Sequence, residues 1–244
     1  KERDGTLTEY KYDINKSDIS KRAVSVVVKG TDGEVISNSK YEYVLKYKPD
    51  GEEWTQKLTT TLDGVRTETA YNECCGLPVS IKQGSEETLF EYDSRGHVTK
   101  KTTATEVTQL QYDLKVNKVS RVEKLARGDK KDKSWSEFKY DEKGNLVFAK
   151  NSENKGVKLF YDQNGRIKSM VDNEKRRIDF KYNENSKPVE ITDPSLGSIK
   201  VTYSNSGEIK KVDSSAGRKI ALQVTSAFQN LLDIIRPAGV SLSF

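Results

Sequence analysis

The sequence predicts an all-β fold, an antiparallel meander of β-hairpin repeats about 21 residues long. Three observations predict it: an aromatic residue followed by Asp, Asn or Ser recurs, Gly often stands four residues after the aromatic, and apolar residues alternate with polar ones around it. The steps between successive tyrosines are 21, 20, 28, 21, 21 and 21 residues for Tyr71, Tyr92, Tyr112, Tyr140, Tyr161, Tyr182 and Tyr203. Such self-similarity indicates one supersecondary unit stacked many times, as an elongated or curved single sheet.

The repeat around Tyr161 shows how each element arises. Residues 157–161 alternate as a strand with one buried face does. In the following turn Asp162 can accept a hydrogen bond from the backbone two residues on, and Gly165 supplies the positive φ that ends a type I turn with a bulge. Alternation restarts at Ile167, and a second turn at Asp172 reverses the chain again. Each repeat therefore contains two strands of about seven residues and two turns.

The residues that carry the repeat are the candidate sites, and we assign them structural roles. The expected aromatic anchors are Tyr12, Tyr47, Tyr71, Tyr92, Tyr112, Tyr140, Tyr161, Tyr182, Tyr203 and Phe244. The expected turn residues are Asp93, Gly96, Asp141, Gly144, Asp162, Gly165 and Gly207. The anchors should share one face of the sheet, and the other face should carry mostly Lys, Glu, Thr and Ser.

The regularity of the repeat divides the chain into two parts. Residues 1–70 read as irregular N-terminal hairpin repeats, and residues 71–244 as a regular array in one continuous sheet. Residues 239–244 copy the pattern of residues 156–161, and residues 5–13 enter on the same half-repeat. Because both ends cut into the repeat, we expect the chain to be a segment of a longer polypeptide.

The segment from Ser226 to Pro237 allows two interpretations. A capping box at Ser226–Gln229, followed by apolar residues at helical spacing, predicts a helix. The phase of the repeat predicts hairpin strands instead, with Val224 as the anchor between Tyr203 and Phe244. We favour the strands, because Arg236-Pro237-Ala238-Gly239 falls at the place in the repeat that Asp193-Pro194…Gly197 occupies.

The composition is that of a thin, solvated structure. Charged residues make up 32% of the chain and hydrophobic residues 34%, the formal net charge is +5, and the mean hydropathy is −0.78. The apolar content is still above that of a disordered chain. We find no apolar run that could span a membrane, and the first residues do not begin a signal peptide.

The two cysteines, Cys74 and Cys75, are adjacent in a predicted turn. Two cysteines give no disulfide framework of the kind that small secreted domains use. Free thiols are the favoured interpretation and a vicinal disulfide is the alternative, so the pair leaves the compartment open.

The motif Tyr-Asp-x-x-Gly followed by Arg, Asn or His and an aliphatic residue resembles the YD repeat of the RHS family. The residues that carry the resemblance are Tyr92-Asp93…Gly96-His97-Val98, Tyr140-Asp141…Gly144-Asn145-Leu146 and Tyr161-Asp162…Gly165-Arg166-Ile167. The resemblance implies a long meander of hairpins that coils, in large members, into a hollow shell. Such shells enclose toxin domains in bacterial toxins and toxin complexes, and form the barrel of teneurin adhesion proteins. It also implies an extracellular or cell-envelope location in bacteria.

The chain departs from the toxin pattern of that family. It has too few repeats to close a large shell by itself. Asp193-Pro194-Ser195-Leu196-Gly197 has the wrong order for the family's Asp-Pro-x-Gly-Leu junction, and no divergent domain follows it within the sequence. The resemblance therefore does not carry toxin activity over to this chain.

Catalytic and metal chemistry find few candidates. His97 is the only histidine, and it stands where a strand restarts after a turn, so a surface role is favoured over a catalytic base. The repeated aspartates are explained as turn formers, and the chain has no Asp-x-Asp-x-Asp-Gly calcium loop. We therefore expect no enzyme activity, no cofactor and no bound metal.

The expected partners follow from the same patterns. The basic stretch from Lys115 to Lys133 is diluted by acidic residues and reads as a solvated insertion, so we expect no nucleic-acid partner. The tyrosines suit cross-strand packing better than sugar stacking. The sequence thus predicts a non-catalytic scaffold, cargo shell or surface-attachment segment, with a protein or cell-surface glycan as partner. The alternatives are a shell fragment of a toxin whose active domain lies elsewhere and, as a third class, a hydrolase built around His97 or paired carboxylates.

Overall fold

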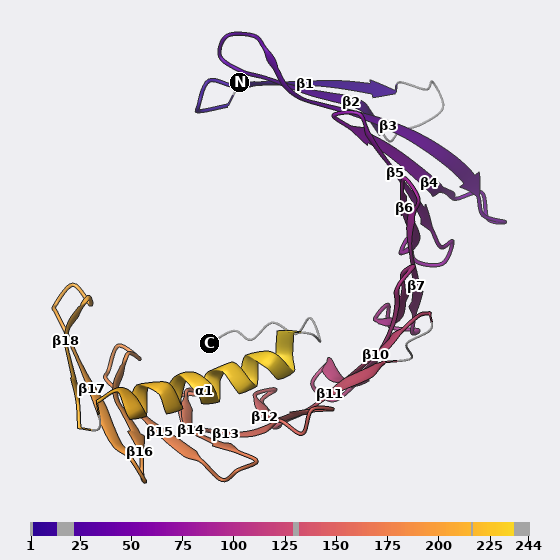
Figure 1. Ribbon diagram of the computed structural model, residues 1–244. Helices are drawn as coiled ribbons and strands as arrows, with labels where there is room; N and C mark the ends of the chain where they lie inside the picture. The colour runs from indigo at the N-terminus through magenta and orange to yellow at the C-terminus, as the bar shows by residue number, and fades with distance from the viewer. Residues whose placement is uncertain (1, 14–21, 129–131, 216, 237–244) are drawn as a thin grey trace. The chain divides into compact units, whose positions relative to one another are not determined.

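The computed structural model describes residues 2–13, 22–128, 132–215 and 217–236 (Figure 1). These residues form eighteen β-strands, assigned to one antiparallel sheet, followed by one helix. The all-β meander that the repeats predict is thereby confirmed. The chain divides into two compact units, residues 1–107 and residues 108–244, and the division after residue 70 by repeat regularity stays a prediction.

The first unit consists of consecutive strands that pair antiparallel with one another. Their bounds are β1 (Leu7–Asp13), β2 (Arg22–Lys29), β3 (Val35–Tyr47), β4 (Glu53–Leu62), β5 (Val65–Tyr71), β6 (Pro78–Gln83), β7 (Glu86–Tyr92) and β8 (Val98–Thr102). Strands β3 and β4 are the longest, with 13 and 10 residues, and they cover the stretch in which the repeat is irregular.

The second unit continues the meander with shorter strands and ends in the helix. Its elements are β9 (Glu106–Asp113), which begins at the unit boundary, β10 (Lys118–Ala126), β11 (Lys133–Tyr140), β12 (Leu146–Asn151), β13 (Gly156–Tyr161), β14 (Ile167–Asp172), β15 (Arg177–Tyr182), β16 (Pro188–Asp193), β17 (Gly197–Tyr203), β18 (Ile209–Ser214) and α1 (Arg218–Ile235). Strands β12–β16 have six residues each. The repeat analysed in the sequence, with strands on either side of Asp162 and a turn at Asp172, corresponds to β13 and β14.

The two faces of the second unit differ. On one face Phe138, Leu159, Phe180 and their neighbours are buried, and α1 packs over this face (Figure 1). Leu231 and Ile234 of the helix are fully buried against the sheet. The opposite face carries mainly charged and polar side chains, as the alternation predicts, together with several aromatic rings.

Three further contacts fix α1 to the sheet. The ring of Phe228 meets that of Phe180 edge-on, with the centroids 5.8 Å apart. The hydroxyl of Ser136 donates to the carbonyl oxygen of Ile234 at 2.9 Å, and Lys155 pairs with Asp233 at 2.7 Å. The last two contacts satisfy polar groups at the edge of the apolar contact.

The prediction of strands in the segment that begins at Ser226 is wrong, because Arg218–Ile235 form α1. The helix begins at Arg218, well before the Ser226 capping box, and Val224 is a helix residue that packs against the core. The physical reason is periodicity: apolar residues recur at helical spacing, and the segment contains neither Gly nor Pro. Phe244, like Lys130 and Lys131 of the basic stretch, lies outside the described residues.

Candidate functional site

In five regular repeats the tyrosine side chain forms a hydrogen bond with the preceding hairpin. In each case the phenol hydroxyl donates to a backbone carbonyl on the return strand of the preceding hairpin. The pairs are Tyr92 to Pro78 at 2.6 Å, Tyr140 to Val119 at 2.7 Å, Tyr161 to Leu146 at 2.8 Å, Tyr182 to Ile167 at 2.7 Å and Tyr203 to Pro188 at 2.9 Å. These bonds link hairpins that are otherwise joined through the strand ladder, and we call them the tyrosine ladder.

A register shift places each of these rings. The pairing slips by one residue immediately before Tyr92, Tyr140, Tyr161, Tyr182 and Tyr203. A bulge adds one residue opposite the strand end and increases the local twist. The shift follows from the turn: Gly96, Gly144, Gly165 and Gly207 have φ of 84°, 81°, 77° and 82°, which glycine adopts without strain.

Four further predicted anchors lie among the described residues. Tyr12 is exposed and stacks on Tyr10 at 6.2 Å. Tyr47 is exposed, and its hydroxyl donates to Glu53 at 3.1 Å. Tyr71 and Tyr112 are half-buried, with Tyr71 at the end of β5 and Tyr112 next to the end of β9. The tyrosine ladder, as defined here, consists of the five bonds from Tyr92, Tyr140, Tyr161, Tyr182 and Tyr203.

One tyrosine that the repeat pattern did not single out makes the same bond. The hydroxyl of Tyr43, in the middle of β3, donates to the carbonyl oxygen of Ala23 at 3.0 Å. Tyr43 lies on the half-buried face of the alternating strand. Alternation placed it on that face, but only the pairing of β2 with β3 brings it within reach of its acceptor.

The turn aspartates brace the loop after each anchor. One carboxylate oxygen of Asp93, Asp141 and Asp162 accepts two backbone N–H groups, two and four residues on, at 2.8–3.0 Å. The backbone N–H of the glycine donates to the carbonyl oxygen of the same aspartate at 3.0–3.1 Å. The carboxylate therefore replaces backbone partners that the tight turn cannot supply.

The side chain of the fifth residue after the tyrosine forms a hydrogen bond with the second carboxylate oxygen of the turn aspartate. His97 Nδ1, Asn145 Nδ2 and Arg166 Nε approach it at 2.9, 2.9 and 2.7 Å. The bond from His97 is the main cause that lowers the pKa of Asp93, and the backbone N–H of Arg166 is the main cause that lowers the pKa of Asp162. His97 thus has a structural partner in its own turn.

Cations at this part of the turn also reach the next repeat. The guanidinium of Arg166 lies 4.7 Å from the ring centre of Tyr182, and the ammonium of Lys187 lies 5.2 Å from that of Tyr203. Lys118 lies 5.6 Å from the ring centre of Tyr140, and its ammonium donates to the carbonyl oxygen of Gly144 at 2.8 Å. Each cation therefore covers the following ring of the tyrosine ladder.

Burial of the rings changes their acidity. Loss of hydration raises the pKa of Tyr140 and of Tyr161 to about 12, because the phenolate would be poorly solvated. Burial also raises the pKa of Tyr92 and Tyr182. The ladder is thus held in its neutral, hydrogen-bond-donating form.

The two cysteines form a disulfide in the turn between β5 and β6. The favoured interpretation of free thiols is therefore wrong. The residues are adjacent, with Cα atoms 3.8 Å apart, and both lie exposed. Sequence adjacency alone does not decide this, because the turn must place both sulfur atoms on the same side.

Within the described ranges no three His, Cys, Asp or Glu side chains stand close enough to hold a metal ion. In that same part of the chain no helix has the length and apolarity to cross a membrane. The chemistry that the repeats offer is therefore one of hydrogen bonding and ion pairing between hairpins.

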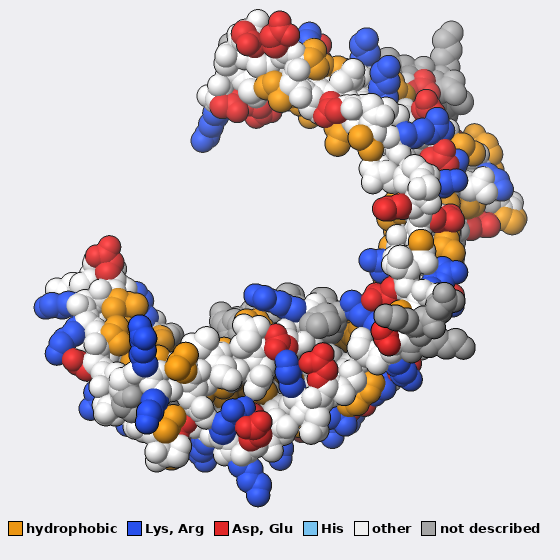
Figure 2. Space-filling view, viewed as in Figure 1, with side chains coloured by type: hydrophobic (Ala, Val, Ile, Leu, Met, Phe, Trp, Pro, Cys, Tyr) orange, Lys and Arg blue, Asp and Glu red, His pale blue; other side chains and the backbone are white. Residues whose placement is uncertain are grey.

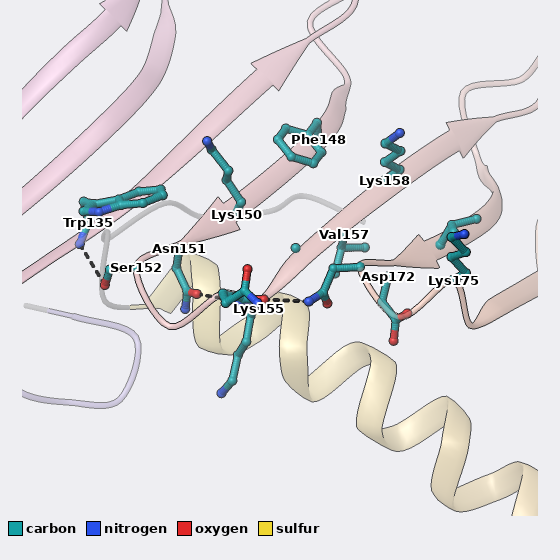
Figure 3. A pocket seen from close by; sticks show the side chains of 14 residues that line it. Trp135, Phe148, Lys150, Asn151, Ser152, Lys155, Val157, Lys158, Asp172 and Lys175 are labelled. Carbon is teal, nitrogen blue, oxygen red and sulfur yellow. Dashed lines mark hydrogen bonds between the residues drawn. The ribbon is translucent and has the colours of Figure 1, made fainter.

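A groove opens on the face of the second unit opposite α1 (Figure 3). It has a volume of about 570 Å³, and Trp135, Phe148, Lys150 and Lys158 project into it from β11, β12 and β13. Sequence reasoning missed this groove, because its residues come together only through the pairing of four strands.

The solved structures to which this chain is similar include Tc toxins, and no curated protein matches the chain. A mutant Tc holotoxin pore of Photorhabdus luminescens shows 11% identity and a TM-score of 0.46 over 88% of this chain. The TcdB2-TccC3-Cdc42 complex shows 13% identity and a TM-score of 0.30 over 79%, and TcdB2-TccC3 without its hypervariable C-terminal region shows 13% and 0.31 over 78%. This chain spans only 14%, 15% and 15% of the lengths of those chains.

A family model described as Teneurin YD-shell matches residues 130–244. That stretch contains the Tyr140, Tyr161, Tyr182 and Tyr203 repeats together with α1. The match confirms the resemblance to YD-repeat proteins for this stretch of the chain.

Proposed function

We propose that the chain is a non-catalytic segment of a YD-repeat shell, exported to the bacterial envelope or the outside of the cell. The observation that carries the proposal is the tyrosine ladder, in which successive hairpins are bonded by side chains as well as by the strand ladder. A sheet bonded in this way can extend by adding hairpins, which is what a wall around a cargo requires.

The distribution of polar groups supports a scaffold over an enzyme. The aspartates that recur in the repeats are engaged by backbone N–H groups of their own turns, and His97 is bonded to one of them. An acid–base or nucleophilic site would need such groups to converge on a substrate.

The proposal is tested on the complete polypeptide that carries this segment. We would digest it with a protease and identify the surviving fragments by mass spectrometry, for the wild type and for a Gly144→Ala/Gly165→Ala variant that strains two ladder turns. A shell predicts that a segment outside the repeats survives in the wild type and is cleaved in the variant.

Two results would contradict the proposal. One is cleavage of every segment outside the repeats at the same rate in both proteins. The other is a hydrolytic activity of the chain that His97→Ala abolishes while the circular-dichroism spectrum stays unchanged.

The runner-up is the same wall as part of a secreted toxin whose active domain lies outside this chain. It is motivated by the RHS resemblance of the repeats. The complete polypeptide would then carry a variable C-terminal domain that is toxic when expressed alone, and the shell without a toxin would lack one.

A further inference from the structure

We propose that the groove on the open face of the second unit binds an acidic peptide segment that contains apolar residues. The groove lies across β11–β14, on the face opposite α1. The groove therefore stays accessible while α1 covers the other face. The proposal does not depend on whether the chain encloses a cargo.

The bottom of the groove is formed by a glycine, Gly156, which has no side chain to fill the space above it. Gly156 of β13 pairs with Lys150 of β12, and a Cβ atom added there would lie 3.8 Å from the Cβ atoms of Lys150 and Asn173. It would also lie 3.8 Å from the carbonyl oxygen of Ala149, so a Cβ atom fits here with ordinary contacts. Phe148 and Val171, on the neighbouring strands, also line the groove. A hollow with apolar walls suits one apolar side chain of a ligand.

Cations alternate with apolar residues beside this hollow. One cross-strand row consists of Lys139, Phe148, Lys158, Val171 and Arg177, each paired with the next. The ammonium of Lys139 lies 5.9 Å from the ring centre of Phe148, and Arg177 is bonded to Asp179. Lys158, in the centre of the row, is exposed and shows no partner among the described residues.

The positive charge of the groove is not neutralised from within. Lys175, in the turn after β14, is exposed and likewise has no partner in the part of the chain that the structure describes. Lys150 is held by Glu137 at 2.8 Å and lies 5.2 Å from the ring centre of Trp135. In Figure 2, Lys and Arg side chains project from the side of this unit that faces away from α1.

Two of the acceptor side chains that line the groove, Asp172 and Asn151, are already engaged. Asp172 accepts two backbone N–H groups and the guanidinium of Arg176, and Asn151 accepts two backbone N–H groups. The ammonium groups of Lys158 and Lys175, which can only donate, have no partner among the described residues. A ligand rich in acceptors therefore fits better than a neutral sugar, whose hydroxyls must also donate.

The dimensions and the pattern favour a peptide. Three strand spacings span about 14 Å, the length of about four extended residues. In such a segment acidic and apolar side chains can alternate. They would then match the cations and apolar side chains that alternate across the strands in the row Lys139, Phe148 and Lys158. Because β12 and β13 are paired on both edges, the peptide would bind through side chains and not as an added strand.

The test uses the 244-residue chain and a fluorescent peptide in which Glu alternates with Phe, followed by anisotropy at low and physiological salt. We expect saturable binding that weakens with salt. Lys158→Glu/Lys175→Glu should weaken it about tenfold, because two attractive charges are replaced by repulsive ones. The matched control Lys210→Glu, on exposed β18, should change it less than about twofold.

A second variant tests the hollow. Gly156→Val fills the space above the floor in an ordinary strand conformation and should weaken the Glu-Phe peptide several-fold. It should leave a Glu-Ser peptide, which should bind more weakly to begin with, unchanged. Unchanged circular-dichroism spectra and melting temperatures identify the variants that remain folded.

The proposal is overturned if the Glu-Phe peptide does not bind, or if it binds the lysine variants as tightly as the wild type. It is also overturned if the Glu-Ser peptide, a sulfated oligosaccharide or an anionic lipid vesicle binds as tightly as the Glu-Phe peptide. In those last cases the surface would recognise negative charge alone.

Discussion

The two units of this chain are built from the same hairpins but differ in what covers them. In the second unit α1 covers one face, and side chains such as Phe138, Leu159, Met170 and Ile178 have at most 3% of their surface exposed. Among the described residues of the first unit, Thr59 is the only one that is buried. Yet both units contain tyrosine hydroxyls bonded to a preceding carbonyl, at Tyr43 and Tyr92 in the first and from Tyr140 to Tyr203 in the second.

The comparison separates two sources of order. Strand pairing, braced turns and tyrosine hydroxyls bonded to a preceding carbonyl occur in both units, with and without a buried core. The apolar core is an addition, which a single helix supplies to one unit by removing its sheet face from water. We therefore expect the register to be shared by both units, and high stability to be confined to the second.

The largest expected effect is on the helix contact. Leu231→Ala removes a fully buried side chain and should lower the free energy of unfolding of the second unit by about 2–5 kcal/mol. The first unit should keep its stability. The matched control Leu222→Ala, at a position 67% exposed, should cost less than about 0.5 kcal/mol. Urea unfolding followed by peptide-resolved hydrogen exchange measures both units, and equal losses in the two units would refute the separation.

The next effect concerns the turns. Gly165→Ala places a Cβ atom at φ 77° in open space, so its cost of about 1–2 kcal/mol should come from backbone strain alone. Gly156→Ala has room for its Cβ atom and an ordinary φ, and should be neutral or stabilising by up to about 1 kcal/mol. Chemical denaturation of the two variants gives the difference. A harmless Gly165→Ala would show that the turn does not need a left-handed residue.

A smaller effect tests the tyrosine ladder in both units. Tyr161→Phe and Tyr92→Phe each leave a carbonyl oxygen without its donor and should each cost about 0.5–1.5 kcal/mol. Tyr12→Phe, at an exposed ring, should cost nothing measurable. If Tyr92→Phe behaved like Tyr12→Phe while Tyr161→Phe was destabilised, the ladder would depend on the core and would not be common to both units.

The smallest effect is expected from alkaline pH. Burial raises the pKa of Tyr140 and Tyr161 to about 12, from the ordinary value of 10.0. Because the folded state favours the neutral phenol, the stability from these groups is fully present below about pH 10 and is lost as pH rises toward about 12. The measurement is the melting temperature of the second unit across this range. Tyr161→Phe should lose less stability there than the wild type, and identical pH profiles would contradict the assignment.

The repeat spacing predicts most of the strands of the second unit because each hairpin is a local structure. Turn residues such as Asp162 and Gly165 act on their own loop, so their effect can be read from a few consecutive letters. The same reasoning predicted that the anchor tyrosines share one face of the sheet. It did not identify the carbonyl acceptors, which lie 14 to 21 residues away.

The failures have a common cause. Repeat phase suggested strands for α1, but burial of Ile220, Leu231 and Ile234 on one side of a helix outweighs phase once a sheet face is available to pack against. The Cys74–Cys75 disulfide depends on the geometry of a single turn. The groove around Gly156 depends on the register of four strands, and no local pattern contains that information.

The most direct test of the central claim is hydrogen exchange of the intact chain, measured for each strand. The account predicts that amides of β12–β16 exchange much more slowly than those of β2–β5, and that Leu231→Ala removes this difference while both units keep their strand signal in circular dichroism. Equal protection of the two sets of strands in the wild-type chain would contradict it.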